Sequence, residues 1–380
     1  MSTSRAILRH KDTTSTSALY MSLDLGDKQW QICVGDGRSG ISRFAVAAGD
    51  KVAVADRVNR AAKHFKLDNR SLVHSVYEAG RDGWWIHRWL REQGIDNIVV
   101  DPASIEVNRR ARRAKTDRLD ADKLLAMLIR HHAGERVWSV LHEPSPQDED
   151  ARREHRELHR LMRERIAHTN RIGSLLVLHN LRPGIVIGGR DWPRWWEAHR
   201  ARVPPLLRAE LERECERLKL VKDQVRAIEA AHRCELADGK QPLVDHLTRL
   251  RAVGSKGAWI LVKEVFGWRQ FANRRELAGS LGLTPTPHAS GSIDREQGIS
   301  KAGNRRVRAL LTELAWSWLR FQPDSDLTLW FNRRFASAGG RMRRVGIVAL
   351  ARRLAIALWR YVKDGEIPAG AQLKPALAEA

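Results

Sequence analysis

The chain has 380 residues, 43% of them hydrophobic, which is enough for two or three domains with cores of their own. Its 67 Lys and Arg residues against 45 Asp and Glu residues give a formal net charge of +22, which makes nucleic acid the expected partner. Three unclustered cysteines argue against zinc or a disulfide framework and for a reducing cytoplasm, and the lack of any apolar run near the roughly 18 residues of a membrane span argues against a membrane protein.

The N-terminal part of the chain predicts an α/β domain. Residues 1–18 are a polar, Ser/Thr-rich extension without an apolar signal segment, and we expect them to be disordered. The expected strands are Leu19–Val34, which contains a return of the chain, Ile41–Ala48, Leu72–Tyr77 and Ile95–Val100; the expected helices are Asp50–Phe65 and Trp84–Gln93. Strands followed by helices that alternate with buried strands are typical of an α/β fold, which we assign to residues 19–143.

Four acidic residues stand out in this basic domain. Asp24 lies inside an apolar strand, where a carboxylate is costly unless its charge is used or paired. Glu78 directly follows another apolar strand, and Asp117 and Asp120 are three residues apart, so that they share one face of a predicted helix. Carboxylates that converge from strand ends and a helix start can bind a pair of Mg²⁺ ions, or Mn²⁺, for phosphoryl transfer. The alternative for the two helix residues is a cap or a partner of the helix dipole.

The middle of the chain, residues 144–240, predicts two long helices. Apolar residues recur at helical spacing among arginines over Pro144–Leu181 and again over Leu206–Leu236. Glycines between 184 and 189 interrupt this pattern, and a Trp-rich insert follows them up to Pro204-Pro205. Two long amphipathic helices around a break fit an antiparallel pair, an intermolecular coiled coil, or a linker that packs on its own chain.

Two histidines of the first long helix, His155 and His159, are four residues apart and could in principle bind a metal ion. Because the sequence offers no third ligand nearby, we expect them to lie on a solvated helix face.

The C-terminal part, residues 241–365, predicts a mostly α-helical domain. Val253–Gly257 (VGSKG) resembles the turn of a helix-hairpin-helix element, in which backbone N–H groups hold a phosphate and Lys256 would assist. An ordinary glycine-containing turn is the alternative. Helix is expected again over Trp316–Tyr361, whose arginines would contact a nucleic-acid backbone, and residues 366–380 form a Pro/Ala-rich tail without an assigned function.

Within this domain, Leu281–Leu310 combines hydroxyl groups with positive charges. The prolines at 285 and 287 predict a loop. Three serines lie on it: Ser290, Ser292 and Ser300. Four cations follow: Lys301, Arg305, Arg306 and Arg308. A serine oxygen could approach a phosphate here while the cations stabilise the anion, and a plain Ser/Gly surface loop before a basic helix is the alternative.

Two sets of short motifs resemble those of the DEDD-type insertion-sequence transposases, the "IS one-ten" family. The N-terminal set is SLDLG at 22–26, YEAG at 77–80 and KTDRLDA at 115–121. The C-terminal set is GLTP at 282–285, Ser290-Gly291 and ISKAGN at 299–304. The two sets occur in the expected order, which makes the resemblance specific.

The resemblance implies a RuvC-like N-terminal domain of ribonuclease H fold, in which Asp24, Glu78, Asp117 and Asp120 bind the metal ions. It implies that Ser290, the serine of the Ser-Gly pair, is the nucleophile and forms a phosphoserine link to DNA, whereas Ser300 could be a helix cap. It also implies a dimerising coiled coil, a homo-oligomer that is a dimer or a tetramer in the synapse, and action on donor and target DNA in the prokaryotic nucleoid. A structured noncoding (bridge) RNA would select both DNA sequences by base pairing.

Two other functions stay open on the sequence alone. A Holliday-junction-type endonuclease would use the same four carboxylates to hydrolyse DNA with water. A non-catalytic nucleic-acid-binding protein would retain only the basic scaffold.

Overall fold

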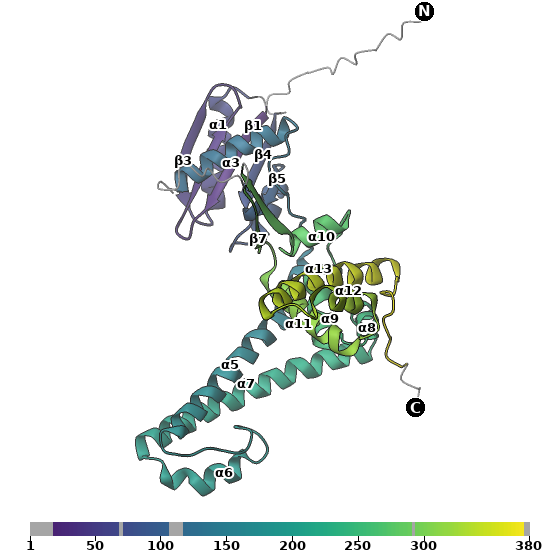
Figure 1. Ribbon diagram of the computed structural model, residues 1–380. Helices are drawn as coiled ribbons and strands as arrows, with labels where there is room; N and C mark the ends of the chain where they lie inside the picture. The colour runs from purple at the N-terminus through teal and green to yellow at the C-terminus, as the bar shows by residue number, and fades with distance from the viewer. Residues whose placement is uncertain (1–17, 68–70, 106–116, 291–292, 376–380) are drawn as a thin grey trace, which may run out of the picture. The chain divides into compact units, whose positions relative to one another are not determined.

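The computed structural model describes residues 18–67, 71–105, 117–290 and 293–375 (Figure 1). The chain divides into two compact units, Met1–Glu143 and Pro144–Ala380. Among the described residues, no helix combines the length and the apolar character that crossing a bilayer requires.

The N-terminal unit is built on one five-stranded sheet, in the order β3-β2-β1-β4-β5. Its strands are β1 (Ala18–Leu25), β2 (Gln29–Gly35), β3 (Ile41–Ala47), β4 (Leu72–Glu78) and β5 (Asp96–Val100). The first three strands form an antiparallel meander, and β4 and β5 run parallel to β1. The expected α/β class is confirmed, and the predicted stretch Leu19–Val34 is the pair of strands β1 and β2 joined by a short return.

Helices cover both faces of this sheet. They are α1 (Lys51–His64), α2 (Trp85–Glu92) and α3 (Asp117–His132). Leu23 and Tyr77 point to the face covered by α1 and α2, whereas Val76 packs with Leu124 of α3 on the other face. Successive side chains of a strand point to opposite faces, so Met21 of β1 faces α1 and α2 with Leu23, whereas Ser22 between them faces α3.

In the second unit, two long helices form an arm (Figure 1). They are α5 (Arg153–Val177), preceded by the short α4 (Pro146–Asp150), and α7 (Pro205–Ala237). Leu161 packs with Val225, and Leu176, later in α5, packs with Leu211, earlier in α7, so the pair is antiparallel. The Trp-rich helix α6 (Trp192–His199) lies at the tip of the arm. The two helices therefore pack on each other within one chain, and a coiled coil between chains stays a prediction.

The rest of the second unit is a helical body with one β-hairpin. Its helices are α8 (Pro242–Thr248), α9 (Ser255–Leu261), α10 (Arg274–Ser280), α11 (Arg305–Phe321), α12 (Asp326–Phe335) and α13 (Gly340–Asp364). Trp318 of α11 and Leu354 of α13 are completely buried in its core. The mostly α-helical architecture agrees with the expectation for this region.

The hairpin formed by β6 (Pro285–Ser290) and β7 (Ile293–Ile299) corrects the prediction of a loop. Proline lacks the N–H that a central strand needs, but it is tolerated at the start of a strand and at bulges. Pro285 begins β6, and the pairing register shifts between Pro285 and Pro287. A two-stranded ribbon has no central strand, so these prolines disturb little of its hydrogen bonding.

The described part of the C-terminal tail packs on this body. The backbone N–H of Gln372 donates to Gln322 Oε1 over 2.7 Å, and the N–H of Asp326 donates to the carbonyl of Ala369 over 3.0 Å. These bonds hold the tail against the ends of α11 and α12.

Candidate active site

Asp24 and Glu78 are neighbours at one edge of the N-terminal sheet. The parallel register pairs Leu23 of β1 with Tyr77 of β4, so the next residue of each strand is the carboxylate. Glu78 is the last residue of β4, and Asp24 is one residue from the end of β1. The two predicted ligands are therefore brought together at the carboxyl ends of adjacent parallel strands.

Both side chains lie on the face of the sheet that α3 covers. Ser22 Oγ donates a hydrogen bond to the carbonyl of Ala121 over 2.7 Å, and Val76 is buried against α3. Side chains two residues apart in a strand point the same way. Asp24 and Glu78 follow these two residues by two positions, so they point toward the beginning of α3.

The beginning of α3 carries the two other predicted carboxylates. Asp120 is partly buried and immediately precedes the residue that binds Ser22. Asp117 is the first residue of α3, but its side chain lies outside the described set. Asp122, two residues after Asp120, binds Arg43 Nε over 2.7 Å and accepts a hydrogen bond from Cys33 Sγ. Among the described residues, Asp24, Glu78 and Asp120 do not form a group whose ligand atoms all lie within 4.8 Å of one another. Carboxylate oxygens are the donors that hard cations such as Mg²⁺ and Mn²⁺ prefer.

The predicted nucleophile and its neighbours lie along the β6–β7 hairpin. Ser290 is the last residue of β6 and pairs with Ile293, which places it at the turn end of the hairpin. Ser292 lies outside the described residues. Ser300 lies at the opposite end, where its N–H donates to the carbonyl of Thr284 over 2.8 Å. The expectation that Ser300 is a helix cap is wrong, because Asn304 caps α11.

Two glycines allow the two chain segments at the base of this hairpin to pack closely. Gly282 and Gly303 have φ values of +65° and +70°, in the left-handed region that favours glycine. A Cβ on Gly282 would lie 2.0 Å from the carbonyl oxygen of Ala302, and one on Gly303 would lie 1.9 Å from that of Ser280. The chain before β6 and the chain after β7 therefore touch backbone to backbone, at a distance that no other residue allows.

A buried carboxylate near the hairpin was not predicted from the sequence. Glu264 lies in a π-helical turn, Val262–Phe266, and its side chain is 1% exposed. His155 Nε2 lies 2.8 Å from its Oε1, and Arg156 donates two hydrogen bonds of 2.8 Å, one to each oxygen. Burial opposes the charge, but the hydrogen bonds from Arg156 and His155 outweigh it and hold the pKa of Glu264 well below its usual range.

The same carboxylate binds the start of α11. Asn304 Nδ2 donates to Glu264 Oε2 over 2.9 Å, and Arg306 Nη1 lies 3.4 Å from Oε1. Glu264 therefore joins the arm helix α5 to the end of the motif that carries the serines. The expectation of a solvated face is wrong for His155, which is buried, and right for His159, which is exposed. A glutamate in an apolar helical stretch needs a partner, and that was the available signal.

Some of the cations predicted to contact nucleic acid already bind other groups of the protein, whereas others are exposed. Arg308 donates to the carbonyl of Ala302 over 2.9 Å, and its pKa is lowered by burial and by the nearby charge of Arg305. Arg306 binds the buried glutamate. Lys256 is exposed and pairs with Glu229 over 2.6 Å. Two further cations are exposed at the foot of the hairpin: Lys301 and Arg305.

Comparison with known proteins identifies the chain. A family model described as "Transposase IS116/IS110/IS902 family" matches residues 244–328. The chain is 39% identical over 377 residues to the protein named "Putative transposase y4rJ" of Sinorhizobium fredii, covering 94% of this chain and 95% of that protein. The chain belongs to the IS116/IS110/IS902 family of transposases. The resemblance drawn from the two motif sets is confirmed.

Other relatives of this transposase are more distant, and two of them match most of both chains. It is 28% identical to "Putative transposase y4qE" of Sinorhizobium fredii, over 91% of this chain and 88% of that protein. It is 25% identical to "Transposase for insertion sequence element IS1111A" of Coxiella burnetii, over 95% and 94% of the two chains. The family model covers the hairpin, the two glycines at its base and Glu264, so these features belong to the matched part of the transposase.

Proposed function

We propose that this transposase cleaves and joins DNA strands with a metal-binding carboxylate cluster in the N-terminal unit and a serine nucleophile in the second unit. The cluster is Asp24, Glu78, Asp117 and Asp120, and the nucleophile is Ser290. The observation that carries the proposal is the placement of Asp24 and Glu78 at the ends of adjacent parallel strands, beside the first turn of α3. The sheet order β3-β2-β1-β4-β5, with an antiparallel meander followed by parallel strands, supports a RuvC-like domain.

Each group has a defined part in the proposed reaction. The carboxylates would hold Mg²⁺ or Mn²⁺, which would polarise phosphoryl oxygens and favour the ionised form of an attacking oxygen. Ser290 Oγ attacks the phosphorus of a DNA phosphodiester and releases its proton to solvent. The bond from phosphorus to the leaving deoxyribose oxygen breaks, and that oxygen takes up a proton. The new serine–phosphate bond keeps the energy of the phosphodiester, so strand joining needs no other energy source.

The hairpin supports the role of Ser290 because it holds the residue on a structured element. Ser290 lies at the turn end, while the base is fixed by Gly282 and Gly303. Lys301 and Arg305 are exposed at that base and would bind DNA phosphates. A catalytic group carried by a rigid element loses less freedom on reaching its target than one on an open loop.

The partners of the reaction follow from charge and family. A net charge of +22 supports extensive contact with nucleic-acid backbones, and a structured guide RNA would supply sequence selection by base pairing. The transposase would act on donor and target DNA as a dimer or tetramer in the prokaryotic nucleoid, with the α5–α7 arm as the dimerising element. Salt-dependent binding of RNA from the flanking element, measured with the full chain, tests the first part, and light scattering with and without nucleic acid tests the second.

A trapping assay tests the chemistry. Purified transposase, co-expressed with RNA from its flanking DNA, is incubated with labelled donor and target DNA and Mg²⁺, and the products are separated on denaturing gels before and after protease. We expect a protease-sensitive protein–DNA band that is lost in Ser290→Ala and Asp24→Asn and kept in Ser300→Ala and Asp122→Asn. An adduct that survives Ser290→Ala would refute the nucleophile. Free cleaved ends without an adduct would instead favour the metal-dependent endonuclease.

A further inference from the structure

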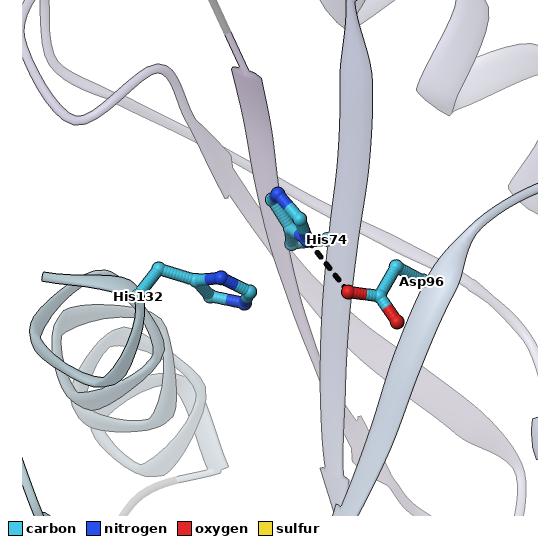
Figure 2. Close-up of side chains that lie close together, drawn as sticks. All are labelled: His74, Asp96 and His132. Atoms are coloured by element: carbon cyan, nitrogen blue, oxygen red, sulfur yellow. Dashed lines mark hydrogen bonds and ion pairs between the residues drawn. The ribbon is translucent and has the colours of Figure 1, made fainter. Parts of the chain in front are cut away.

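A second cluster of metal-ligand side chains lies in the N-terminal unit, away from the carboxylates. His74 of β4, Asp96 of β5 and His132 at the end of α3 face one another (Figure 2). His74 Nδ1 lies 2.9 Å from Asp96 Oδ2, and the rings of His74 and His132 have their centroids 3.8 Å apart. One ligand atom from each residue falls within 4.8 Å of the other two.

The fold places this cluster at the opposite end of α3 from Asp120. The parallel register pairs His74 directly with Asp96, near the beginnings of β4 and β5, whereas Glu78 ends β4. His132 is the last residue of the 16-residue helix α3, so about 18 Å of helix separates it from Asp120. The two clusters therefore lie under opposite ends of the same helix.

The surroundings give the cluster one fixed ligand and two accessible ones. The side chain of His74 is 12% exposed and stacks on the ring of Tyr20, with centroids 5.6 Å apart. Asp96 and His132 are exposed, so an ion can enter from solvent and keep water in its remaining positions. Ligand atoms around a tetrahedral ion with bonds near 2.0–2.1 Å are about 3.4 Å apart. The three ligand atoms, which lie within 4.8 Å of one another, are close to this spacing.

The donor set decides which ion fits. Two imidazoles and one carboxylate suit borderline divalent ions such as Zn²⁺, Co²⁺ and Ni²⁺, whereas Mg²⁺ prefers oxygen alone. Imidazole binds a metal ion only in its neutral form. Cysteine usage argues against zinc in this chain, but this cluster uses no cysteine.

We propose that His74, Asp96 and His132 form a binding site for a divalent transition-metal ion, with Zn²⁺ as the best fit, and that the bound ion fastens the end of α3 to β4 and β5. The helix fastened in this way is the one that begins with Asp117 and carries Asp120 in its first turn. The ion has a structural role here and takes no part in strand cleavage. Its binding can be measured without DNA, so the result is independent of the proposed transposition chemistry.

Co²⁺ titration of the full chain, stripped with a chelator and returned to neutral pH, tests the proposal. We expect one equivalent to bind with the visible absorption of a tetrahedral or five-coordinate site, and we expect Zn²⁺ but not millimolar Mg²⁺ to displace it. His132→Ala and Asp96→Asn should each weaken binding at least tenfold. His64→Ala, an exposed histidine at the end of α1 and outside the cluster, should leave binding unchanged.

Three results would overturn the site: no stoichiometric binding to the wild-type chain, equal affinity in His132→Ala, or displacement of Co²⁺ by Mg²⁺. Circular dichroism of each variant distinguishes loss of a ligand from loss of fold. If His132→Ala fails to fold, Asp96→Asn decides the question, because Asp96 is exposed and its substitution removes a ligand without removing core volume. Zn²⁺ should also raise the Tm of the wild type and not that of Asp96→Asn.

Discussion

Asn304 caps α11 and at the same time binds Glu264. Its Oδ1 accepts the backbone N–H groups of Arg306 and Val307, and its Nδ2 donates to Glu264 Oε2 over 2.9 Å. His155 and Arg156 bind the same carboxylate from α5. One buried charge therefore connects the arm, the π-helical turn and the helix that follows the hairpin.

Replacing this charge should destabilise the second unit. Glu264→Gln removes a buried carboxylate that accepts hydrogen bonds from Arg156 and Asn304, and a hydrogen bond to a charged group contributes about 1.5–3 kcal/mol. Urea unfolding should show that loss as a lower midpoint. Glu229→Gln is the matched control, because the Lys256 partner is exposed and such pairs contribute less than about 1 kcal/mol. Equal effects of the two substitutions would contradict the assigned role of Glu264.

The stability of the second unit should fall in acid. The folded-state pKa of Glu264 is below its ordinary value of 4.5, so its contribution is complete above pH 4.5 and is lost as the pH falls toward the folded-state pKa. Below the ordinary value the unfolded chain binds more protons than the folded one, so the free energy of unfolding decreases with decreasing pH. Urea titrations at a series of pH values should show that the difference in free energy of unfolding between wild type and Glu264→Gln becomes smaller as the pH falls from 7 to 3. A difference in free energy of unfolding that stays constant with pH would mean that ionisation of Glu264 does not cause the loss of stability in acid.

The close backbone contact at Gly303 predicts that alanine substitution there and at Gly279 will have very different effects on stability. Gly303→Ala places a Cβ 1.9 Å from the carbonyl oxygen of Ser280 at a φ of +70°, so the base of the hairpin must shift. We expect a loss of at least about 2 kcal/mol and loss of the protein–DNA adduct. Gly279→Ala, at a helical position with no atom within 4 Å of its Cβ, should be neutral or slightly stabilising. Wild-type adduct yield in Gly303→Ala would show that the base need not be tight.

Substitutions of Asp120 and Asp122, which lie on the same helix, should differ in their effect on metal binding. Asp120→Asn removes a proposed metal ligand and should weaken Mn²⁺ binding at least tenfold, as followed by electron paramagnetic resonance, with little change in Tm. Asp122→Asn removes a partner of Arg43 and should leave Mn²⁺ binding intact. If Asp122→Asn weakened Mn²⁺ binding and Asp120→Asn did not, the metal site would lie on the face of α3 that carries Asp122, and the proposal would be wrong.

Local patterns were enough to predict most of the elements and part of the site. Alternation and apolar runs predicted β1 and β4, and the position of Asp24 and Glu78 in those strands predicted their meeting. The hairpin was missed because prolines at 285 and 287 normally favour a loop, and only pairing with β7 shows how they are accommodated.

Glu264 and His74 were missed for a different reason. Glu264 is 109 residues from His155 in sequence, and His74 is 22 residues from Asp96, so no spacing within one element relates the partners. A single residue in an apolar stretch signals that a buried charge needs a partner, but it does not say which residue supplies it.

The long helix α5 is attached to Glu264 at one end only. Helix α5 has 25 residues and extends about 37 Å from its base, where His155 and Arg156 bind Glu264, to the end that leads into α6. A movement of the tryptophan-rich tip relative to the helical body would turn α5 about this base. Such a movement would change the position of Glu264 and, through Asn304, of the start of α11.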